Sequence, residues 1–266
     1  MQQQVQRAQG ALTRSTSPGA LIIGASTGIG ASLARVLAAR GYAVALIGRQ
    51  SDKLSLLAGA INGGGEARAT AYPHDVRDYE AAPELFARVA SDMATAGATF
   101  SLVVYAAGVM PAETQGAWSF EDERAMIETN VIGAMRWLDL AAAAFQRSGG
   151  GTIAAISSVA GDRGRRGNSA YMASKAALST FLESLRYRQH GTGVRVVTIK
   201  PGYVATPMTA GAKTPKPLTI SADQAAQQIA AACERGAAVV YVPGYWRAIM
   251  WIIRALPASL MTRLPV

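Results

Sequence analysis

Ala20-Leu-Ile-Ile-Gly24-Ala-Ser-Thr-Gly28-Ile-Gly30 is the stretch of this 266-residue chain that decides its fold. An apolar run meets three closely spaced glycines, and the next segment, Ala31 to Arg40, carries apolar residues at helical spacing (Leu33, Val36 and Leu37). We predict a strand, a glycine turn and a helix, followed by a second strand over Tyr42 to Ile47. Such glycines let the backbone approach a pyrophosphate, which binds the unpaired amides of the helix. A simple structural turn is the less favoured interpretation, because the flanking elements are all in place.

A second pattern combines a tyrosine, a lysine and a serine. Tyr171 and Lys175 are four residues apart, and Ser158 precedes the tyrosine. On a helix these first two residues share a face, so the ammonium can favour the ionised phenol and lower its pKa from about 10. A tyrosine tuned in this way can protonate an alkoxide near neutral pH. The same spacing also occurs by accident on exposed helices, so its weight depends on the glycine turn that precedes it.

The rest of the chain alternates strand-like runs with helical stretches, as a parallel sheet with crossover helices requires. We therefore predict an α/β fold: a single Rossmann-type doubly wound domain with a seven-stranded parallel sheet and helices on both faces. We divide the chain into a flexible tail (1–17), a dinucleotide-binding catalytic domain (18–242) and an apolar, Arg-punctuated C-terminal segment (243–266). The expected strands are Leu21 to Ile23, Val44 to Ile47, a short strand near Ala67 to Pro73, Ser101 to Ala106, Gly151 to Ile156, Val194 to Ile199 and Val239 to Val242.

Over about residues 18 to 242 the chain resembles the short-chain dehydrogenase/reductase family. The matching motifs are Gly24-x-x-x-Gly28-Ile-Gly30, Asp75-Val76, Ala106-Ala107-Gly108, Asn130, Ile156-Ser157-Ser158, Tyr171-x-x-x-Lys175 and Pro201-Gly202. Two positions depart from the family pattern. Ile23 stands where threonine is usual, and Tyr105 stands where asparagine is usual. These two positions put the local packing of the sheet in question.

The resemblance implies roles for individual residues. Tyr171 is the expected acid/base, Ser158 polarises the substrate carbonyl, Lys175 holds the nicotinamide ribose and lowers the tyrosine pKa, and Asn130 completes a water-linked proton path. The expected cofactor-binding residues are Gly24, Ser26, Thr27, Gly28, Ile29, Gly30, Arg49, Asp75, Val76, Ala106, Ala107, Gly108, Asn130, Tyr171, Lys175, Pro201, Gly202, Val204 and Thr206.

The end of the second strand bears on the choice of cofactor. A carboxylate there would bind the ribose 2′-hydroxyl and repel a 2′-phosphate, but this chain has Gly48-Arg49, and its nearest acid is Asp52. Arg49 can pair with the phosphate and Ser26 can add a hydrogen bond, so NADP(H) is favoured over NAD(H). The alternative is an Arg49 that caps a solvated loop, with a relaxed cofactor preference.

Composition excludes other chemistries. Two histidines and a single cysteine, Cys233, make neither a metal cluster nor a disulfide, so we expect no metal and a reduced, cytoplasmic compartment; Cys233 is expected in the core. The first seventeen residues have no apolar core for a secretory signal, although their lack of acids leaves an organelle-targeting interpretation open. The net charge of +9 favours an anionic partner, but no nucleic-acid motif accompanies it.

NADP-linked members of the family mostly reduce ketones, so the expected reaction is ketone reduction to a secondary alcohol with Tyr171 as general acid. The alternatives are a soluble reductase or dehydrogenase of small hydrophobic ketones or alcohols, and a non-catalytic NADP-sensing protein. Family members usually form homo-dimers or homo-tetramers through two long helices, here expected over Phe120 to Phe145 and Tyr171 to His190.

Two unusual segments bear on the substrate. The C-terminal segment has Trp246, Trp251 and arginines at intervals of seven residues (Arg247 and Arg254), and its apolar runs fall short of the roughly 20 residues that span a bilayer. It can lie in a membrane surface, or pack as a pocket wall or across a subunit interface. Gly161 to Asn168 carries three arginines that can grip a phosphate or simply face solvent.

With Pro217-Leu-Thr-Ile220 and Leu264-Pro-Val266, these segments are similar to reductases that convert a polyprenyl-phosphoryl 2-keto-pentose into the arabinose form. That resemblance implies a lipid-linked keto-sugar as substrate and peripheral contact with the inner face of the membrane.

Overall fold

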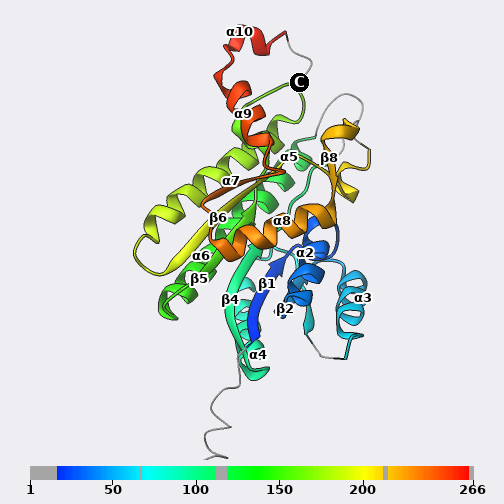
Figure 1. Ribbon diagram of the computed structural model, residues 1–266, viewed down its shortest axis with the longest axis vertical. Helices are drawn as coiled ribbons and strands as arrows, with labels where there is room; N and C mark the ends of the chain where they lie inside the picture. Colours follow the sequence, from blue (N-terminus) through cyan, green and yellow to red (C-terminus); the bar gives the residue numbers. More distant parts are fainter. Residues whose placement is uncertain (1–16, 66–67, 112–118, 212–214, 264–266) are drawn as a thin grey trace, which may run out of the picture.

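Seven parallel strands form one twisted sheet in the order β3-β2-β1-β4-β5-β6-β9 (Figure 1). The computed structural model describes residues 17–65, 68–111, 119–211 and 215–263. The chain builds one half of the sheet outward from β1, then returns to lay β4 on its other side, so the order reverses between β1 and β4. The strands are β1 (Ser17–Ile23), β2 (Ala43–Gly48), β3 (Ala69–Pro73), β4 (Ala98–Tyr105), β5 (Gly151–Ile156), β6 (Val194–Pro201) and β9 (Val239–Val242).

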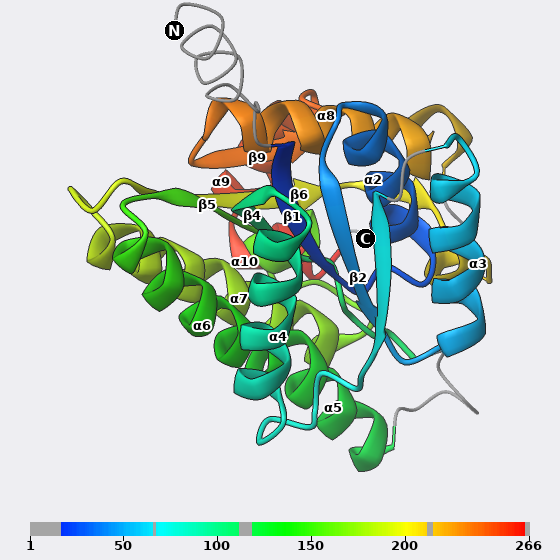
Figure 2. The same cartoon turned by 90° about the horizontal axis from the view of Figure 1, so that it is seen from below.

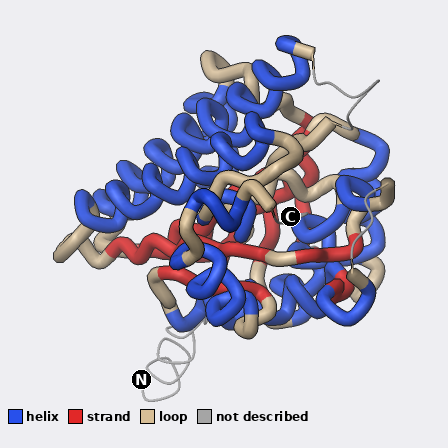
Figure 3. The backbone as a smooth tube through the Cα atoms, turned by 90° about the horizontal axis from the view of Figure 1, so that it is seen from above, coloured by secondary structure: helices blue, strands red, loops and turns tan. Residues whose placement is uncertain are grey.

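Helices cover both faces of this sheet, because each crossover between parallel strands must traverse a face. Figure 2 shows α2 (Gly28–Ala39), α3 (Ser51–Asn62) and α8 (Ala222–Arg235) on one side of the strands, and α4 (Ala82–Thr95), α6 (Gly133–Arg147) and α7 (Ser169–Arg188) on the other. The tube drawing in Figure 3 shows the same layering from the opposite direction. The predicted α/β fold with seven parallel strands is confirmed.

Alternate residues of each strand supply two separate cores. Ile22 of β1 faces α2 and α8, whereas Leu21 and Ile23 face α6 and the helices beside it. Ile23 and Tyr105, the two departures from the family pattern, are both fully buried in that second core. Cys233 is buried in the first core, as predicted, and this burial raises the pKa of its thiol to about 12.

Several boundaries differ from the sequence prediction. The helix expected over Phe120 to Phe145 consists of α5 (Phe120–Ile127), a π-helical turn η1 (Glu128–Ile132) and α6. A small second sheet, which the sequence analysis did not predict, pairs β7 (Tyr203–Ala205) with β8 (Thr219–Ser221). The remaining short elements are the 3-10 turns η2 (Val159–Asp162), η3 (Pro207–Thr209) and η4 (Lys216–Leu218). The expected N-terminal tail lies almost wholly outside the described residues, as does Leu264-Pro-Val266.

The C-terminal segment forms α9 (Trp246–Ala255) and the short α10 (Ala258–Met261), which stand together at one end of the molecule (Figure 1). The inner side of α9 is apolar: Trp246 and Met250 are buried and pack with Val159, the first residue of η2. This segment therefore packs against the part of the chain that directly follows Ser158, and none of its described residues lines the cleft itself.

Candidate active site

A long cleft opens at the carboxyl ends of the strands, where the strand order reverses. Ligands of open α/β sheets bind at this place because the loops diverge there. The structure brings nearly all of the predicted cofactor-binding and catalytic residues to the walls of this cleft. They are Gly24, Ser26, Thr27, Gly28, Ile29, Gly30, Arg49, Asp75, Val76, Ala106, Ala107, Gly108, Ser158, Tyr171, Lys175, Pro201, Gly202, Val204 and Thr206.

The glycine turn has no room for a side chain at Gly24 or Gly30. A Cβ on Gly30 would lie 2.1 Å from the carbonyl oxygen of Gly24, and one on Gly24 would lie 2.4 Å from the amide nitrogen of Ala107. Gly24 and Gly28 also have positive φ angles of 94° and 57°. Thr27, the N-cap of α2, makes no side-chain capping bond with the described residues. The first amides of α2 therefore line the cleft without a side-chain cap, and they suit an anion such as a pyrophosphate.

Tyr171 and Lys175 lie in the first turns of α7. The Asn168 side chain caps this helix by accepting a hydrogen bond from the Tyr171 amide at 2.8 Å, which fixes where the helix starts. The Lys175 ammonium donates to the Ile156 carbonyl at 2.9 Å and lies 5.6 Å from the centre of the Tyr171 ring. Ser158, which follows β5, lines the same cleft, and its hydroxyl lies close enough to the phenol to lower the pKa of Tyr171. The geometry thus joins the three residues that the sequence analysis grouped.

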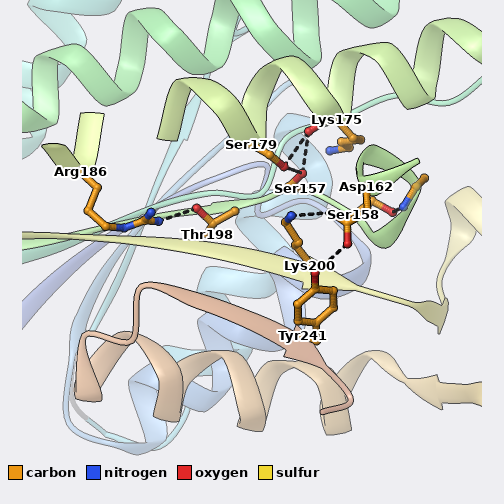
Figure 4. Close-up of polar contacts among 10 residues, drawn as sticks. Ser157, Ser158, Asp162, Lys175, Ser179, Arg186, Thr198, Lys200 and Tyr241 are labelled. Carbon is orange, nitrogen blue, oxygen red and sulfur yellow. Dashed lines mark hydrogen bonds and ion pairs between the residues drawn. The ribbon is translucent and has the colours of Figure 1, made fainter. Parts of the chain in front are cut away.

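Hydrogen bonds of serine hydroxyls join the end of β5 to α7 next to Ser158, Tyr171 and Lys175. Ser157 donates to the Lys175 carbonyl at 2.9 Å and lies 2.7 Å from the Ser179 hydroxyl, as Figure 4 shows. Gly161 packs directly on the same turn, since a Cβ there would lie 2.6 Å from the carbonyl carbon of Lys175. Ser158 is consequently held between two elements that both contact the helix carrying the phenol.

The ionisation of Tyr171 differs from the sequence prediction. We expected Lys175 to lower the pKa of the phenol, but burial raises the pKa of Tyr171, and the nearby Ser158 hydroxyl offsets this only in part. The reason is the direction of the lysine side chain, whose ammonium is bound by the Ile156 carbonyl. Burial also lowers the pKa of Lys175 to about 8.

Asn130 does not line the cleft, although its neighbour Thr129 does. The Asn130 side chain is fully buried in the π-helical turn, where Nδ2 donates to the Val109 carbonyl at 3.1 Å and to the Ser174 hydroxyl at 3.0 Å. Its Oδ1 accepts from the Val109 amide at 2.8 Å. The side chain therefore fixes the loop after β4, and only the main chain of Asn130 is left to act on a proton path.

Arg49 and Asp75 mark the far end of the cleft. Arg49 is exposed at the end of β2. Asp75 pairs with Arg77 at 2.7 Å, and this hydrogen bond lowers the pKa of the carboxyl, with a smaller contribution from the charge of Arg49. The charge on Asp75 is therefore compensated by Arg77, and Arg49 is the guanidinium that lines this part of the cleft among the described residues.

Sequence reasoning missed several residues of the cleft wall. A Cβ on Gly48 would lie 2.2 Å from the Ser26 hydroxyl, so this glycine is required by a close contact that no motif announces. Most of the others adjoin predicted residues in sequence, and that adjacency was the available signal. The missed residues are Gly48, Gln50, His74, Val109, Thr129, Ile156, Ser157, Pro207, Met208 and Thr209.

The segment from Gly161 to Asn168, which we call the arginine loop, binds the C-terminal segment. Arg163 donates to the Arg254 carbonyl at 2.8 Å, and Arg166 donates to the Thr262 carbonyl at 2.6 Å. Two of the three arginines that the sequence analysis considered for phosphate binding thus bind the C-terminal segment to the loop after Ser158.

A buried polar cluster lies beside this loop. The Asp162 carboxylate pairs with the Lys200 ammonium and accepts from the Tyr241 hydroxyl at 2.7 Å (Figure 4). Lys200 directly precedes Pro201-Gly202. The cluster therefore links the loop after Ser158 to the segment that lines the opposite wall.

Within the described ranges, no three His, Cys, Asp or Glu side chains gather as a metal site would need. No described helix combines the length and apolar character needed to cross a membrane.

Comparison with known proteins places this cleft in a family. A family model for short chain dehydrogenases matches residues 19–217. An uncharacterized oxidoreductase of Mycobacterium tuberculosis strain H37Rv is 32% identical over 245 residues, covering 92% of this chain and 96% of the relative. The ketoacyl reductase HetN of Nostoc sp. strain PCC 7120 is 31% identical over 216 residues, covering 77% of this chain and 74% of HetN.

Solved structures share the fold. A short chain dehydrogenase from Burkholderia cenocepacia in complex with NADP is 27% identical with a TM-score of 0.75, covering 86% of this chain and 97% of that one. A 3-ketoacyl-(acyl-carrier-protein) reductase from Brucella melitensis complexed with NADH has a TM-score of 0.75 at 20% identity, covering 85% and 96%. With the glycine turn, the reversal of strand order and the Ser-Tyr-Lys trio in one cleft, these matches show that the chain belongs to the short-chain dehydrogenase/reductase family and is an NAD(P)-dependent oxidoreductase.

Proposed function

We propose that this protein reduces a ketone to a secondary alcohol with NADPH. The observation that carries the proposal is the joining of Tyr171, Ser158 and Lys175 at the cleft wall opposite the glycine turn. The similarity to a ketoacyl reductase supports a carbonyl as the reacting group.

The cleft fits a dinucleotide. The uncapped first turn of α2 and the close packing at Gly24 and Gly30 suit a pyrophosphate. By the family motifs, Asp75 and Val76 would contact adenine, Lys175 the nicotinamide ribose, and Pro201-Gly202 the nicotinamide side. When bound, the cofactor supplies the hydride that reduces the carbonyl carbon.

The side chains of the protein then handle the proton. The Tyr171 phenol donates its proton to the carbonyl oxygen as negative charge develops there, and the Ser158 hydroxyl donates a hydrogen bond to the same oxygen. Lys175 holds its ammonium 5.6 Å from the centre of the phenol ring and bound to the Ile156 carbonyl, where by the family motif it would hold the nicotinamide ribose. The Asn130 main chain would then carry the water-linked path that returns the proton.

The raised pKa of Tyr171 agrees with a phenol that begins the reaction as a proton donor. Because burial raises this pKa, the phenol is protonated at neutral pH and is ready to donate. An alcohol oxidation would need the opposite, a phenolate poised to accept a proton.

Arg49 supports the choice of NADP(H) over NAD(H). It lies exposed on the cleft wall at the end of β2, where a guanidinium can form a bidentate pair with a 2′-phosphate and Ser26 can add a hydrogen bond. The NADP bound to the Burkholderia cenocepacia enzyme agrees with this preference. The more distant Brucella melitensis structure was determined with NADH, so the fold itself accommodates either nucleotide.

The decisive experiment is Tyr171→Phe. This variant should lose at least about 100-fold in turnover, because it lacks the proton donor, yet bind NADPH within about twofold of wild type. Turnover is measured by NADPH oxidation with ethyl acetoacetate, a small neutral ketone, and binding by nucleotide fluorescence. Activity within tenfold of wild type would reject the assignment.

For the substrate, we propose a hydrophobic or lipid-linked ketone, and a lipid-linked keto-sugar is the specific candidate. The supporting observation is the outer side of α9 and α10, where Trp251 is 75% exposed, Ile252 55% and Leu260 46%. The exposed guanidinium groups of Arg247 and Arg254 lie on the same segment. We define Arg247, Trp251, Ile252, Arg254 and Leu260 as the C-terminal surface.

Such a surface suits peripheral contact with anionic lipids, since apolar side chains enter the headgroup region while arginines pair with phosphates. Within the arginine loop, Arg165 is the residue that we propose meets a substrate phosphate, because Arg163 and Arg166 donate to carbonyls of the C-terminal segment. A soluble reductase of small hydrophobic ketones is the alternative, and it predicts full activity on ethyl acetoacetate without any lipid.

We also propose a homo-dimer or homo-tetramer. The supporting observation is the exposed apolar side chains on α5, η1 and α7: Phe120 is 72% exposed, Ile132 43% and Tyr187 69%. Sedimentation equilibrium of the purified protein measures the assembly directly.

A further inference from the structure

Two tyrosine hydroxyls hold the π-helical turn η1 that carries Asn130. Tyr79 donates to the Glu128 carbonyl at 3.3 Å, and Tyr105 donates to the Thr129 carbonyl at 2.5 Å. A π turn shifts the carbonyls of a helix from their usual pairing, and the Glu128 carbonyl also accepts from the Gly133 amide within the turn. Two consecutive carbonyls just before Asn130 thus have phenol donors from outside the helix.

The Tyr105 contact is closely packed. Tyr105 is fully buried at the end of β4, next to Ala106-Ala107-Gly108, and its hydroxyl lies against Gly133. A Cβ on Gly133 would lie 2.8 Å from this oxygen and 3.1 Å from the Val76 carbonyl. The Tyr105 hydroxyl therefore occupies the space that a side chain at position 133, the first residue of α6, would need. Burial raises the pKa of Tyr105 well above its ordinary value, so the hydroxyl is always a donor.

From the held carbonyl, contacts lead to the proposed reacting groups. Thr129 lines the cleft, and Asn130 follows it. The Asn130 amide donates to the Ser174 hydroxyl at 3.0 Å, and that hydroxyl donates to the Tyr171 carbonyl at 2.7 Å. On the other side, a Cβ on Gly108 would lie 3.3 Å from Asn130 Oδ1 and 3.5 Å from Lys175 Nζ. A small movement of η1 would thus be transmitted to α7 and to the lysine.

We propose that Tyr105 is a positioning residue: its hydroxyl, by holding the Thr129 carbonyl, keeps the π conformation of η1 and so the placement of Asn130 against Lys175 and Tyr171. The role of this placement in proton return rests on the proposed function. Tyr105 stands where the family usually has asparagine, so this chain reaches from the sheet to the turn with a longer donor. Without the hydroxyl, a buried carbonyl loses its donor, and the turn can recover a partner by shifting toward ordinary α-helical pairing.

The test compares Tyr105→Phe with Tyr72→Phe. Tyr72 is a matched control because it is also buried in the second core and its hydroxyl donates to a different partner, Asp92, at 2.7 Å. Both variants lose one hydroxyl and should lose similar thermal stability. Only Tyr105→Phe should lower kcat with ethyl acetoacetate, by about 10- to 100-fold, with the KM for NADPH within about twofold, because misplaced groups slow the reaction more than binding. Its solvent deuterium isotope effect on kcat should rise, since proton transfer becomes slower.

Hydrogen exchange gives a readout that does not depend on turnover. Amides of residues 128–133, followed by mass spectrometry, should exchange at least about fivefold faster in Tyr105→Phe and unchanged in Tyr72→Phe, because local opening requires loss of the Thr129 contact. Gly133→Ala, which crowds the same hydroxyl, should reproduce both effects. Gly133→Ala with Tyr105→Phe should be no worse than either alone, since both variants act on one contact.

Equal kinetics and equal exchange for the two phenylalanine variants would overturn the inference. Failure of the proposed function has a separate signature, because Tyr171→Phe would then be active. In that case exchange in residues 128–133 still decides whether Tyr105 holds the turn.

Discussion

Lys175→Met should make the protein more stable while removing its activity. Burial lowers the pKa of Lys175 from its ordinary value of 10.5 to about 8, so the folded state holds the ammonium less readily than the unfolded state does. That difference corresponds to about 3 kcal/mol of destabilisation at neutral pH. Methionine keeps the aliphatic length but leaves the Ile156 carbonyl without its donor, a loss of about 1 to 2 kcal/mol. The expected net gain is about 1 to 2 kcal/mol, or about 2 to 8 °C in Tm.

The sign of the pH dependence follows from the lowered pKa. Below about pH 8 the lysine is charged in both states, and the penalty on the folded state is complete. As the pH rises from about 8 toward 10.5, the unfolded state binds more protons than the folded one, so the wild type gains stability. The advantage of Lys175→Met should therefore be largest at pH 6 to 7 and should shrink above pH 8, as differential scanning calorimetry can measure.

Lys200→Met is the matched control. The Lys200 side chain is 13% exposed, and it pairs with Asp162, whose side chain is only 2% exposed. Its removal leaves an uncompensated carboxylate and should cost about 3 to 5 kcal/mol. The two lysines should thus give changes of opposite sign. A Lys175→Met variant that melts below wild type at pH 7, or a difference that is constant up to pH 10, would refute the reasoning.

Two further predictions concern the proposed partners. Arg49→Ala should weaken NADPH binding by about 1.5 to 3 kcal/mol and NADH binding much less, because only NADPH presents a 2′-phosphate; fluorescence titrations measure both, and equal losses would mean that Arg49 does not contact the phosphate. Trp251→Ser with Ile252→Ser should reduce sedimentation with phosphatidylglycerol vesicles, whereas Leu56→Ser, at a side chain 74% exposed on α3, should not. Absence of sedimentation by the wild-type protein would reject membrane contact.

The sequence predicted the elements of the sheet because each strand has a continuous apolar run and the glycine turn fixes the first crossover. Most residues of the cleft could be predicted for the same reason, since the loops that carry them directly follow recognisable strand ends. Gly48 was missed because its requirement comes from Ser26, a contact across two loops that no local pattern records.

Other features depend on tertiary contacts that spacing does not encode. The π turn interrupts a helix whose apolar period gives no sign of it, and its stability comes from Tyr79 and Tyr105 on distant segments. The pKa of Tyr171 was predicted in the wrong direction because helical spacing brings Lys175 near the phenol but says nothing of the Ile156 carbonyl. The arginine loop was placed near the site, yet the partners of Arg163 and Arg166 lie about a hundred residues further on.

The fastening of the C-terminal segment has a consequence for how such enzymes can be recombined. Trp246 packs so closely on Gly202 that a Cβ at position 202 would lie 1.9 Å from the indole nitrogen. Arg163 and Arg166 bind main-chain carbonyls of the same segment. The C-terminal segment therefore contacts both the loop after Ser158 and Gly202. A C-terminal segment taken from a relative would have to pack against Arg163, Arg166 and Gly202, which in this chain fit its own α9 and α10. Exchange of the C-terminal segment between relatives therefore requires that residues 159–168, position 202 and the segment from Trp246 onward be transferred together.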